Sequence, residues 1–467
     1  MADATVDPTR AARLLTREFE PGRRLESTSH ASSPSDSVVI KGLASEACVS
    51  DDGRFVAFAA QANGRDWYHN EPGRLRYDIF LKDRLNGELR RISNGVDGAD
   101  PNDSSFGVSM SADGRYVAFA SRASNLVEND TNRATDVFLY DRESHQTRLV
   151  STAQNGTPAN LSSFAPRISA DGKVIAFIST ANNLTDEPTG CNEKVVVKEL
   201  ATGRVEVVSR PTGGVSQHGL AEQISLSGDG SLVAFNFMGR SLDASVPQAT
   251  DAWGHEKFDP QVYLHNRKTG ETRLVSRNQE GQAADGRCID PTISRDGQRI
   301  AFASVASNLT AGDAAGMMAV YQASLLGALE RVSGDQPGSA PTFSGDGRWI
   351  GWESRGQIEL RSQEGELLTV DRPPAQKEYP LEGPPVNVAP QLSQDGNTVV
   401  FLTRERDRDT PDGMHSHIHT FDFEHARAQL NWVGTPEQGS ATVSAGADAV
   451  VIGGVRLRRR GAGITPN

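Results

Sequence analysis

Short apolar runs recur along this chain, and each follows a polar phrase of the same kind. The phrase is a serine, one spacer, Asp-Gly and a polar residue, followed by a mostly apolar run that ends in Phe or Trp. It begins at Ser50 (SDDGRFVAF), Ser111 (SADGRYVAF), Ser169 (SADGKVIAF), Ser227 (SGDGSLVAF), Ser294 (SRDGQRIAF), Ser344 (SGDGRWIGW) and Ser393 (SQDGNTVVF). A weaker eighth copy, SAGADAVVI, begins at Ser444. The start-to-start spacings are 61, 58, 58, 67, 50, 49 and 51 residues. Periods near 50 are typical of propellers and related arrays.

Two further phrases follow the first in most copies. One reads DIFLKD at 78–83, DVFLYD at 136–141 and QVYLHN at 261–266. The other reads LRRIS at 89–93, TRLVS at 147–151, VEVVS at 205–209, TRLVS at 272–276 and LERVS at 329–333. These β-branched and aromatic runs between Gly, Asp and Asn are typical of short strands, and Asp-Gly is a hairpin turn. Each repeat therefore predicts four antiparallel strands.

Four-stranded units repeated radially predict an all-β protein with a single β-propeller. We expect a propeller over 23–460, an N-terminal tail or short helix over 1–22 and a C-terminal tail over 461–467. The segment RRLESTS at 23–29 is similar to the fourth-strand phrase. It could complete the blade of the eighth copy and so remove open sheet edges. This predicts eight blades, and the alternative is seven blades with the last copy as a tail.

The S-x-D-G-x-x-[VI]-[AG]-F and D-V-F-L-Y-D phrases resemble the TolB-like, WD40-like propeller family of bacteria. A-S-N-L at 123–126 and 306–309, and ANNL at 181–184, add to the resemblance, which covers roughly residues 23 to 460. It implies a bacterial origin and a propeller fold. It implies little about function, because one fold serves many roles.

Composition excludes several classes of function. The chain has 467 residues, with 48 Lys+Arg and 60 Asp+Glu, so its formal net charge is −12. An acidic chain argues against nucleic-acid binding, and no apolar run approaches the length of a membrane-spanning helix. The N-terminus has no signal-peptide pattern. Cys48, Cys191 and Cys288 show neither zinc spacing nor a disulfide framework. We therefore expect a cytoplasmic protein.

Length variation predicts where a partner binds. The insertions at 59–77, 236–260 and 403–417 lie between the second and third strands of their copies, and 371–390 links two copies. All of these connections fall on one face of an up-and-down propeller. The aromatic and histidine residues in them are the expected anchors for a protein partner. These residues are Trp67, Tyr68, His69, Trp253 and His255.

Two segments carry metal-ligand chemistry. His415 and His417 alternate along an expected strand, which places both on one side, where they could hold Zn²⁺. Asp130, Asn132 and Asp136 are closely spaced oxygen donors that could hold Ca²⁺. Packed histidines and loop-capping Asx turns are the structural alternatives. Neither segment completes a known metal motif, so the sequence predicts no obligatory cofactor.

The sequence contains no nucleophile elbow, P-loop, dinucleotide-binding fingerprint or H-E-x-x-H motif. It favours a non-catalytic scaffold that binds a protein partner through the face that carries the long loops. In one form of this hypothesis the scaffold is a subunit of a larger assembly. The alternative is a hydrolase or lyase that acts on a glycan or small ester in the central funnel, with or without a metal. Oligomeric state is not readable from the sequence.

Overall fold

The computed structural model describes the strands from residue 35 to residue 459 with gaps. The described residues are 35–40, 44–61, 76–128, 130–186, 193–214, 218–246, 248, 254–313, 316–325, 329–371, 386–393, 396, 398–406, 414–422, 442–443, 449–452 and 455–459. They form antiparallel sheets, with one 3₁₀ turn, η2 (Val96–Gly98), after the first sheet.

Six sheets contain four strands each, and five of these are continuous in sequence. The five are β2 (Ala44–Val49), β3 (Phe55–Gln61), β4 (Tyr77–Asp83) and β5 (Leu89–Arg91); β6 (Ser105–Met110), β7 (Tyr116–Ser121), β8 (Asp136–Asp141) and β9 (Gln146–Leu149); β10 (Ser163–Ile168), β11 (Val174–Ser179), β12 (Lys194–Glu199) and β13 (Val205–Val207); β14 (Gly219–Leu226), β15 (Leu232–Gly239), β16 (Gln261–Asn266) and β17 (Glu271–Leu274); and β18 (Cys288–Ile293), β19 (Arg299–Ser304), β20 (Ala319–Ser324) and β21 (Leu329–Arg331).

The other two sheets combine distant parts of the chain. In the sixth four-stranded sheet, β1 (Ser35–Ile40) pairs with β28 (Met414–Asp422), beside β27 (Thr398–Arg406) and β26 (Val386–Leu392). The remaining sheet has seven strands in the order β22-β23-β24-β25-β31-β30-β29. These strands are β22 (Ser339–Phe343), β23 (Trp349–Ser354), β24 (Gln357–Ser362), β25 (Leu367–Asp371), β29 (Thr442–Val443), β30 (Ala449–Ile452) and β31 (Val455–Arg459).

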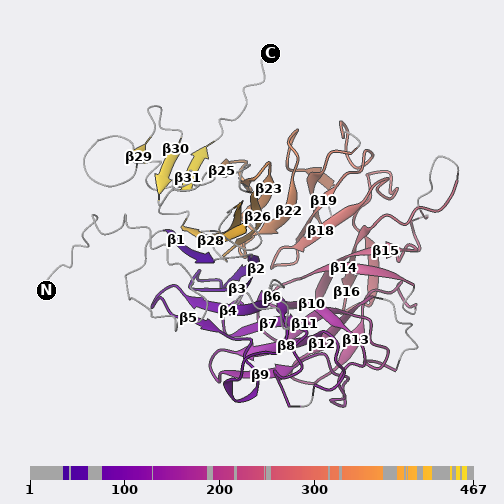
Figure 1. The fold of residues 1–467 in the computed structure, drawn as a ribbon. Helices are drawn as coiled ribbons and strands as arrows, with labels where there is room; N and C mark the ends of the chain where they lie inside the picture. The colour runs from indigo at the N-terminus through magenta and orange to yellow at the C-terminus, as the bar shows by residue number, and fades with distance from the viewer. Residues whose placement is uncertain are drawn as a thin grey trace, which may run out of the picture.

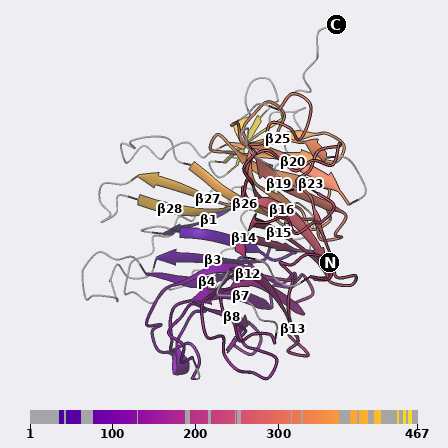
Figure 2. The same cartoon turned by 90° about the vertical axis from the view of Figure 1, so that its right-hand side faces the viewer.

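The sheets close into a ring through their first strands. β2, β6, β10, β14, β18, β22 and β26 contact one another in that order, and β26 contacts β2 again. Figure 1 shows the sheets following one another round the molecule until orange β26 lies beside indigo β2. Figure 2 shows β1, β27 and β28 next to β3 and β4, where the two ends of the ring meet. The all-β propeller with four-stranded antiparallel blades is therefore confirmed.

The predicted blade count is wrong. The structure has six four-stranded blades, the remaining sheet of the ring has seven strands, and the eighth copy forms no blade of its own. Its strands β29–β31 instead extend the sheet of β22–β25, because β31 pairs with the edge strand β25, with Leu368 opposite Arg459. The alternative of seven blades with a free C-terminal tail is wrong for the same reason. An unpaired edge strand offers a row of free backbone hydrogen-bonding groups. The degenerate last copy pairs with one such edge strand, β25.

The N-terminal part of the chain does complete a sheet, but not the sheet that we predicted. β1 pairs with β28, which belongs to the seventh copy, and Ser37 lies opposite His419. The segment 23–29, which we expected to supply this strand, lies outside the described residues. Among the described strands, none from the N-terminal part of the chain pairs with the eighth copy.

In the six copies whose Asp-Gly turn is described, the serine hydroxyl donates to the aspartate in the same way. In the second copy, Ser111 Oγ donates to Asp113 Oδ1 at 2.6 Å and accepts the N–H of Tyr116 at 3.0 Å. The N–H of Arg115 also donates to Asp113 Oδ1 at 3.0 Å. Gly114 has φ +65°, which only glycine adopts without strain. The aspartates of the six described turns are thus turn residues, as the sequence predicted.

One buried histidine predicts a pH dependence of stability. His265 on β16 is 2% exposed, and its Nδ1 lies 2.9 Å from Thr272 Oγ1. Thr272 Oγ1 donates to the carbonyl of Arg210, so it accepts from the protonated Nδ1 of a neutral imidazole. Burial lowers the pKa of His265 to about 4, helped by Arg210 and Arg267 and opposed by Glu206. The unfolded chain therefore binds a proton below pH 6.5 that the folded chain does not bind until pH 4.

We expect this histidine to lower the free energy of unfolding by about 2 kcal/mol between pH 7.5 and pH 5. His265→Gln should remove that share of the pH dependence while keeping a donor for Thr272. Urea unfolding of both proteins at the two pH values measures it. An equal loss of stability in both proteins would show that His265 does not titrate with a lowered pKa.

Candidate functional site

Strand order decides which connections share a face. In each four-stranded blade the first-to-second and third-to-fourth turns lie at one end. The second-to-third connections and the links between blades lie at the other end, which we call the loop face. Gln61 pairs with Tyr77, and Arg406 pairs with Met414, so the strand ends that flank two long insertions meet at this face. The topology therefore places these insertions where the sequence predicted them.

Exposed apolar side chains are concentrated on the loop face. Leu161, Leu220 and Phe258 are 37%, 41% and 45% exposed. Leu161 lies in the link to β10, Leu220 is the second residue of β14, and Phe258 lies between β15 and β16. Leu85, which is 62% exposed, lies in the β4–β5 turn at the opposite end. Within the described part of the chain, three of these four large exposed apolar side chains thus belong to two neighbouring blades of the loop face.

The predicted partner-binding residues are only partly described. His255 is exposed and lies three residues before Phe258. Trp67, Tyr68, His69 and Trp253 lie outside the described residues, so their role stays a prediction. The sequence missed Leu220 and Phe258 because single apolar residues next to a strand look like core positions. Only their exposure in the folded chain distinguishes them.

The predicted zinc residues lie on one strand. β28 lies between β27 and β1, with His415 opposite Glu405 and His417 opposite Thr403. His419 lies opposite Phe401, as Phe138 lies opposite Phe119, which confirms the register of this copy. The side chains of His415 and His417 are not among those described. Zinc binding here stays a prediction.

The seven first strands that close the ring, which we call the innermost strands, share a feature that the sequence did not reveal. All seven carry a register shift at the same place, four residues before the serine of the turn phrase. The residues there include several with positive φ, which is rare for residues other than glycine. These are Glu46, Gly107, Ala165, Asp290 and Ala340. A bulge of this kind turns side chains and frees backbone N–H groups.

Polar side chains at these bulges bind the next sheet. Glu46 Oε2 accepts the N–H of Val108 at 3.1 Å. Gln223 Oε1 accepts the N–H of Asp290 at 2.7 Å, and Asp290 Oδ2 accepts the N–H of Ala340 at 3.1 Å. Each bond joins one sheet to its neighbour. These acids and amides therefore act as supports of the ring.

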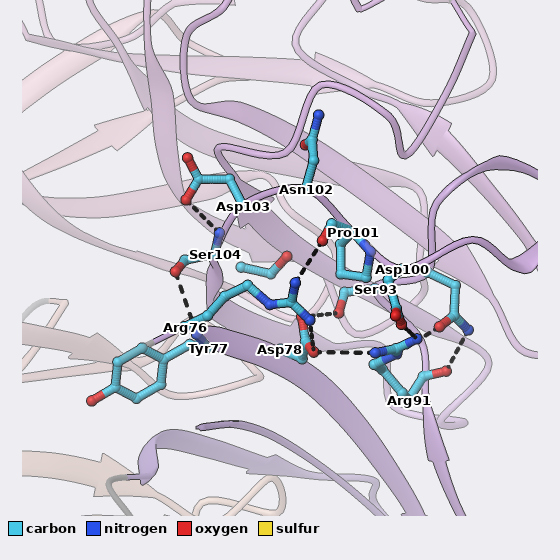
Figure 3. Close-up of polar contacts among 12 residues, drawn as sticks. Arg76, Tyr77, Asp78, Arg91, Ser93, Asp100, Pro101, Asn102, Asp103 and Ser104 are labelled. Atoms are coloured by element: carbon cyan, nitrogen blue, oxygen red, sulfur yellow. Dashed lines mark hydrogen bonds and ion pairs between the residues drawn. The ribbon is translucent and has the colours of Figure 1, made fainter. Parts of the chain in front are cut away.

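A buried ion-pair network fills the start of the third strand in the first blade (Figure 3). Asp78, the second residue of β4, is fully buried, and Arg76 is 4% exposed. Their side chains lie 3.3 Å apart, and Arg91 Nη1 lies 3.5 Å from the same carboxylate oxygen. Arg76 also donates to the carbonyl of Pro101 at 2.7 Å, and Arg91 pairs with Asp100 at 2.5 Å. Burial raises the pKa of Asp78, and the two guanidinium groups oppose that rise.

The second blade has acids at this place without the arginines. Asp136, the first residue of β8, is fully buried and accepts hydrogen bonds from Ser151 Oγ at 2.6 Å and from Asn132 Nδ2 at 2.7 Å. Asp130 is 8% exposed, and both of its carboxylate oxygens are buried and accept no side-chain hydrogen bond among the described residues. Burial raises the pKa of Asp136 to about 7; the bonds from Ser151 and Asn132 oppose the rise, and Asp130 adds to it. The structure thus brings the three predicted calcium residues together.

The cysteines offer little nucleophilic chemistry. Cys48 and Cys288 are free thiols, and burial raises the pKa of each to about 12. A thiol with so high a pKa is protonated at neutral pH and is a poor nucleophile or metal ligand. Cys191 lies outside the described residues.

No helix in the described part of the chain has the length and apolar character needed to cross a membrane. The described residues also include no group of three or more His, Cys, Asp or Glu placed to hold a metal ion.

Comparison with known proteins finds similarity among solved structures. No protein-family model and no curated protein matches this chain. Among solved structures it is similar to oligogalacturonate lyase from Vibrio parahaemolyticus, with 15% identity over 82% of this chain and 91% of that chain and a TM-score of 0.47. It is also similar to the β-propeller domain of Cps50 (Swd1) from Myceliophteria thermophila, with 11% identity over 82% and 97% and a TM-score of 0.41.

A third similar structure is a putative TolB from Agrobacterium tumefaciens, with 14% identity over 72% of this chain and 94% of that chain and a TM-score of 0.36. The chain is a β-propeller. At these identities and TM-scores the similar structures carry no argument about function. Membership of the TolB-like, WD40-like family within the propellers stays a prediction from the repeated phrases.

Proposed function

We propose that this propeller is a non-catalytic interaction module that binds a protein partner through its loop face. The observation that carries the proposal is the position of Leu161, Leu220 and Phe258. Several large apolar side chains exposed on one face of a propeller favour a protein-binding surface on that face. An aromatic residue such as Phe258 is a frequent anchor in such interfaces.

The bonds among the innermost strands support the same proposal. Glu46, Gln223 and Asp290 are the kind of residues that a funnel hydrolase or lyase would use as acids, bases or ligands. Here each accepts a backbone N–H of the next sheet. These three side chains therefore have a structural role in joining neighbouring sheets, which explains their presence without a catalytic role.

The proposal is tested by removing the exposed apolar groups from one face at a time. The double variant Leu220→Ser/Phe258→Ser alters the loop face, and Leu85→Ser is the matched control on the opposite end. All three side chains are more than a third exposed, so we expect both variants to fold like the natural chain. Thermal unfolding checks this before any binding measurement.

Partner capture is measured with the tagged full chain in extracts of the cells that produce it, with quantitative mass spectrometry. We expect the double variant to retain at least ~10-fold less of a stoichiometric partner than the natural chain, because truncating interface anchors costs ~2 kcal/mol or more. Leu85→Ser should retain it fully. Equal retention by all three proteins, or an equal loss with Leu85→Ser, would contradict binding through the loop face.

A further inference from the structure

Two buried carboxylates lie in the connection after β7 and at the start of β8. Asp130 is 8% exposed and Asp136 is fully buried. Neither forms an ion pair within 4 Å with a lysine, arginine or histidine in the described part of the chain. Both oxygens of Asp130 are shielded from solvent and accept no side-chain hydrogen bond there, and the backbone of Asn132 opposes the rise that burial gives to the pKa of this carboxyl. Burying a carboxylate in this way is costly unless a counter-ion or a proton neutralises it.

In the first and fifth blades, an arginine balances the buried acid at this place. In the first blade, the buried Asp78 faces Arg76 and Arg91. In the fifth, Asp313 stands at the position of Asp130, four residues after the leucine of A-S-N-L. Its side chain is 1% exposed and lies 3.5 Å from Arg331 Nη1.

Strand register shows which residue of the second blade stands in the place of this arginine. Arg91 lies opposite Phe80, and Arg331 lies opposite Tyr321. The corresponding residue of the second blade is Leu149, which lies opposite Phe138. The second blade therefore keeps two acids at this place and has replaced the arginine with an apolar residue.

We propose that Asp130 and Asp136 bind one Ca²⁺ ion in the space where the first and fifth blades place an arginine. Carboxylates are hard oxygen ligands, which Ca²⁺ prefers, and its coordination tolerates irregular geometry better than that of Mg²⁺. Asn132 turns its amide nitrogen toward Asp136 and toward the carbonyl of Ala159, at 2.7 Å in both cases. Asn132 therefore positions Asp136 and is not itself a ligand. Asp130 is the residue whose oxygens are most available to the ion.

The site has two charged ligands, so water and neutral oxygens complete the shell of six to eight. Affinity for Ca²⁺ rises with the number of charged ligands, and we expect a dissociation constant of ~10⁻⁵ to 10⁻³ M. The site lies in a second-to-third connection and so belongs to the loop face. It does not depend on the partner-binding proposal, because its evidence is confined to the second blade.

The test is calcium titration of the EDTA-treated full chain by calorimetry, with MgCl₂ in a parallel arm. We expect one Ca²⁺ per chain and weaker binding of Mg²⁺. Asp130→Asn should weaken calcium binding at least ~10-fold. Asp186→Asn, the same change at an exposed residue of the β11–β12 connection, should leave it unchanged. Absence of binding at 5 mM CaCl₂, tighter binding of Mg²⁺ or equal binding by Asp130→Asn would overturn the proposal.

A stability measurement makes the test independent of the titration. In EDTA, Asp130→Asn should unfold at a higher urea concentration than the natural chain, because it removes an unbalanced buried charge. In 5 mM CaCl₂ the order should reverse. Leu149→Arg restores the arginine of the first and fifth blades and should abolish calcium binding while leaving both acids in place. Unchanged calcium binding in a folded Leu149→Arg variant would also overturn the proposal.

Discussion

Gly230→Ala is expected to lower the free energy of unfolding by about 2–5 kcal/mol. Gly230 is the glycine of the fourth Asp-Gly turn and has φ +65°. A residue with a Cβ pays about 1–2 kcal/mol in this conformation. The added Cβ would also lie 2.8 Å from Cβ of Val174 and 3.0 Å from its Cγ2. Val174 begins the second strand of the preceding blade and is buried, so it cannot move aside without repacking, which costs about 1–3 kcal/mol more.

Gly156→Ala is the matched control. Gly156 also has a positive φ, +86°, but a Cβ added there would meet no atom within 4 Å. We expect a loss of only about 1–2 kcal/mol, from the backbone conformation alone. Urea unfolding of both variants measures the difference. Equal losses would show that contact between blades at the turn contributes nothing, and that glycine is needed there for its backbone conformation only.

Arg76→Ala is expected to destabilise the chain by about 3–5 kcal/mol. Arg76 and Asp78 are almost completely buried and lie 3.3 Å apart. Removing one partner of such a pair leaves a charge in a medium that solvates it poorly. Arg91 remains 3.5 Å from Asp78 and keeps the loss from being larger. Urea unfolding at neutral pH measures it.

The double variant Arg76→Ala/Asp78→Asn distinguishes a lost ion pair from lost packing. It should be less destabilised than the sum of the two single variants, because it leaves no unpaired charge. Arg204→Ala is the exposed comparison. Arg204 is 57% exposed and lies 3.1 Å from Glu206, so we expect a change within about 1 kcal/mol. Additive losses in the double variant would contradict the assignment of Arg76 as the main counter-ion of Asp78.

The local structure of each repeat could be predicted because it depends on neighbouring residues. Ser111 and Asp113 are two residues apart and bond to each other and to the following N–H groups, so the turn forms wherever the phrase occurs. Positions such as Phe119 and Phe138 pack because strand alternation places both in the core. The four-stranded antiparallel blade follows from these short-range rules.

The bulges and the buried ion pairs could not be predicted in the same way. The bulge position is Glu46 in one copy, Gly107 in another and Gln223 in a third, so no residue type marks it. Its bonds run to the next sheet, some 50 to 70 residues away in the chain. Likewise, Asp130, Asn132 and Asp136 are close in sequence, but the absence of an arginine opposite them becomes visible only when the strands are in register.

The sequence by itself determined the repeat, its strands, its turns and the face that carries the long connections. Those features depend on hydrophobic alternation and on turn chemistry, which act over a few residues. Tertiary structure decided how many blades form, which strand closes the ring and where the eighth copy goes. Strand edges are chemically alike, since each presents the same backbone donors and acceptors, so only the packed ring selects which of them pair. Tertiary structure also decided which apolar side chains stay exposed and which buried acids lack a counter-ion, because both depend on neighbours that folding brings together.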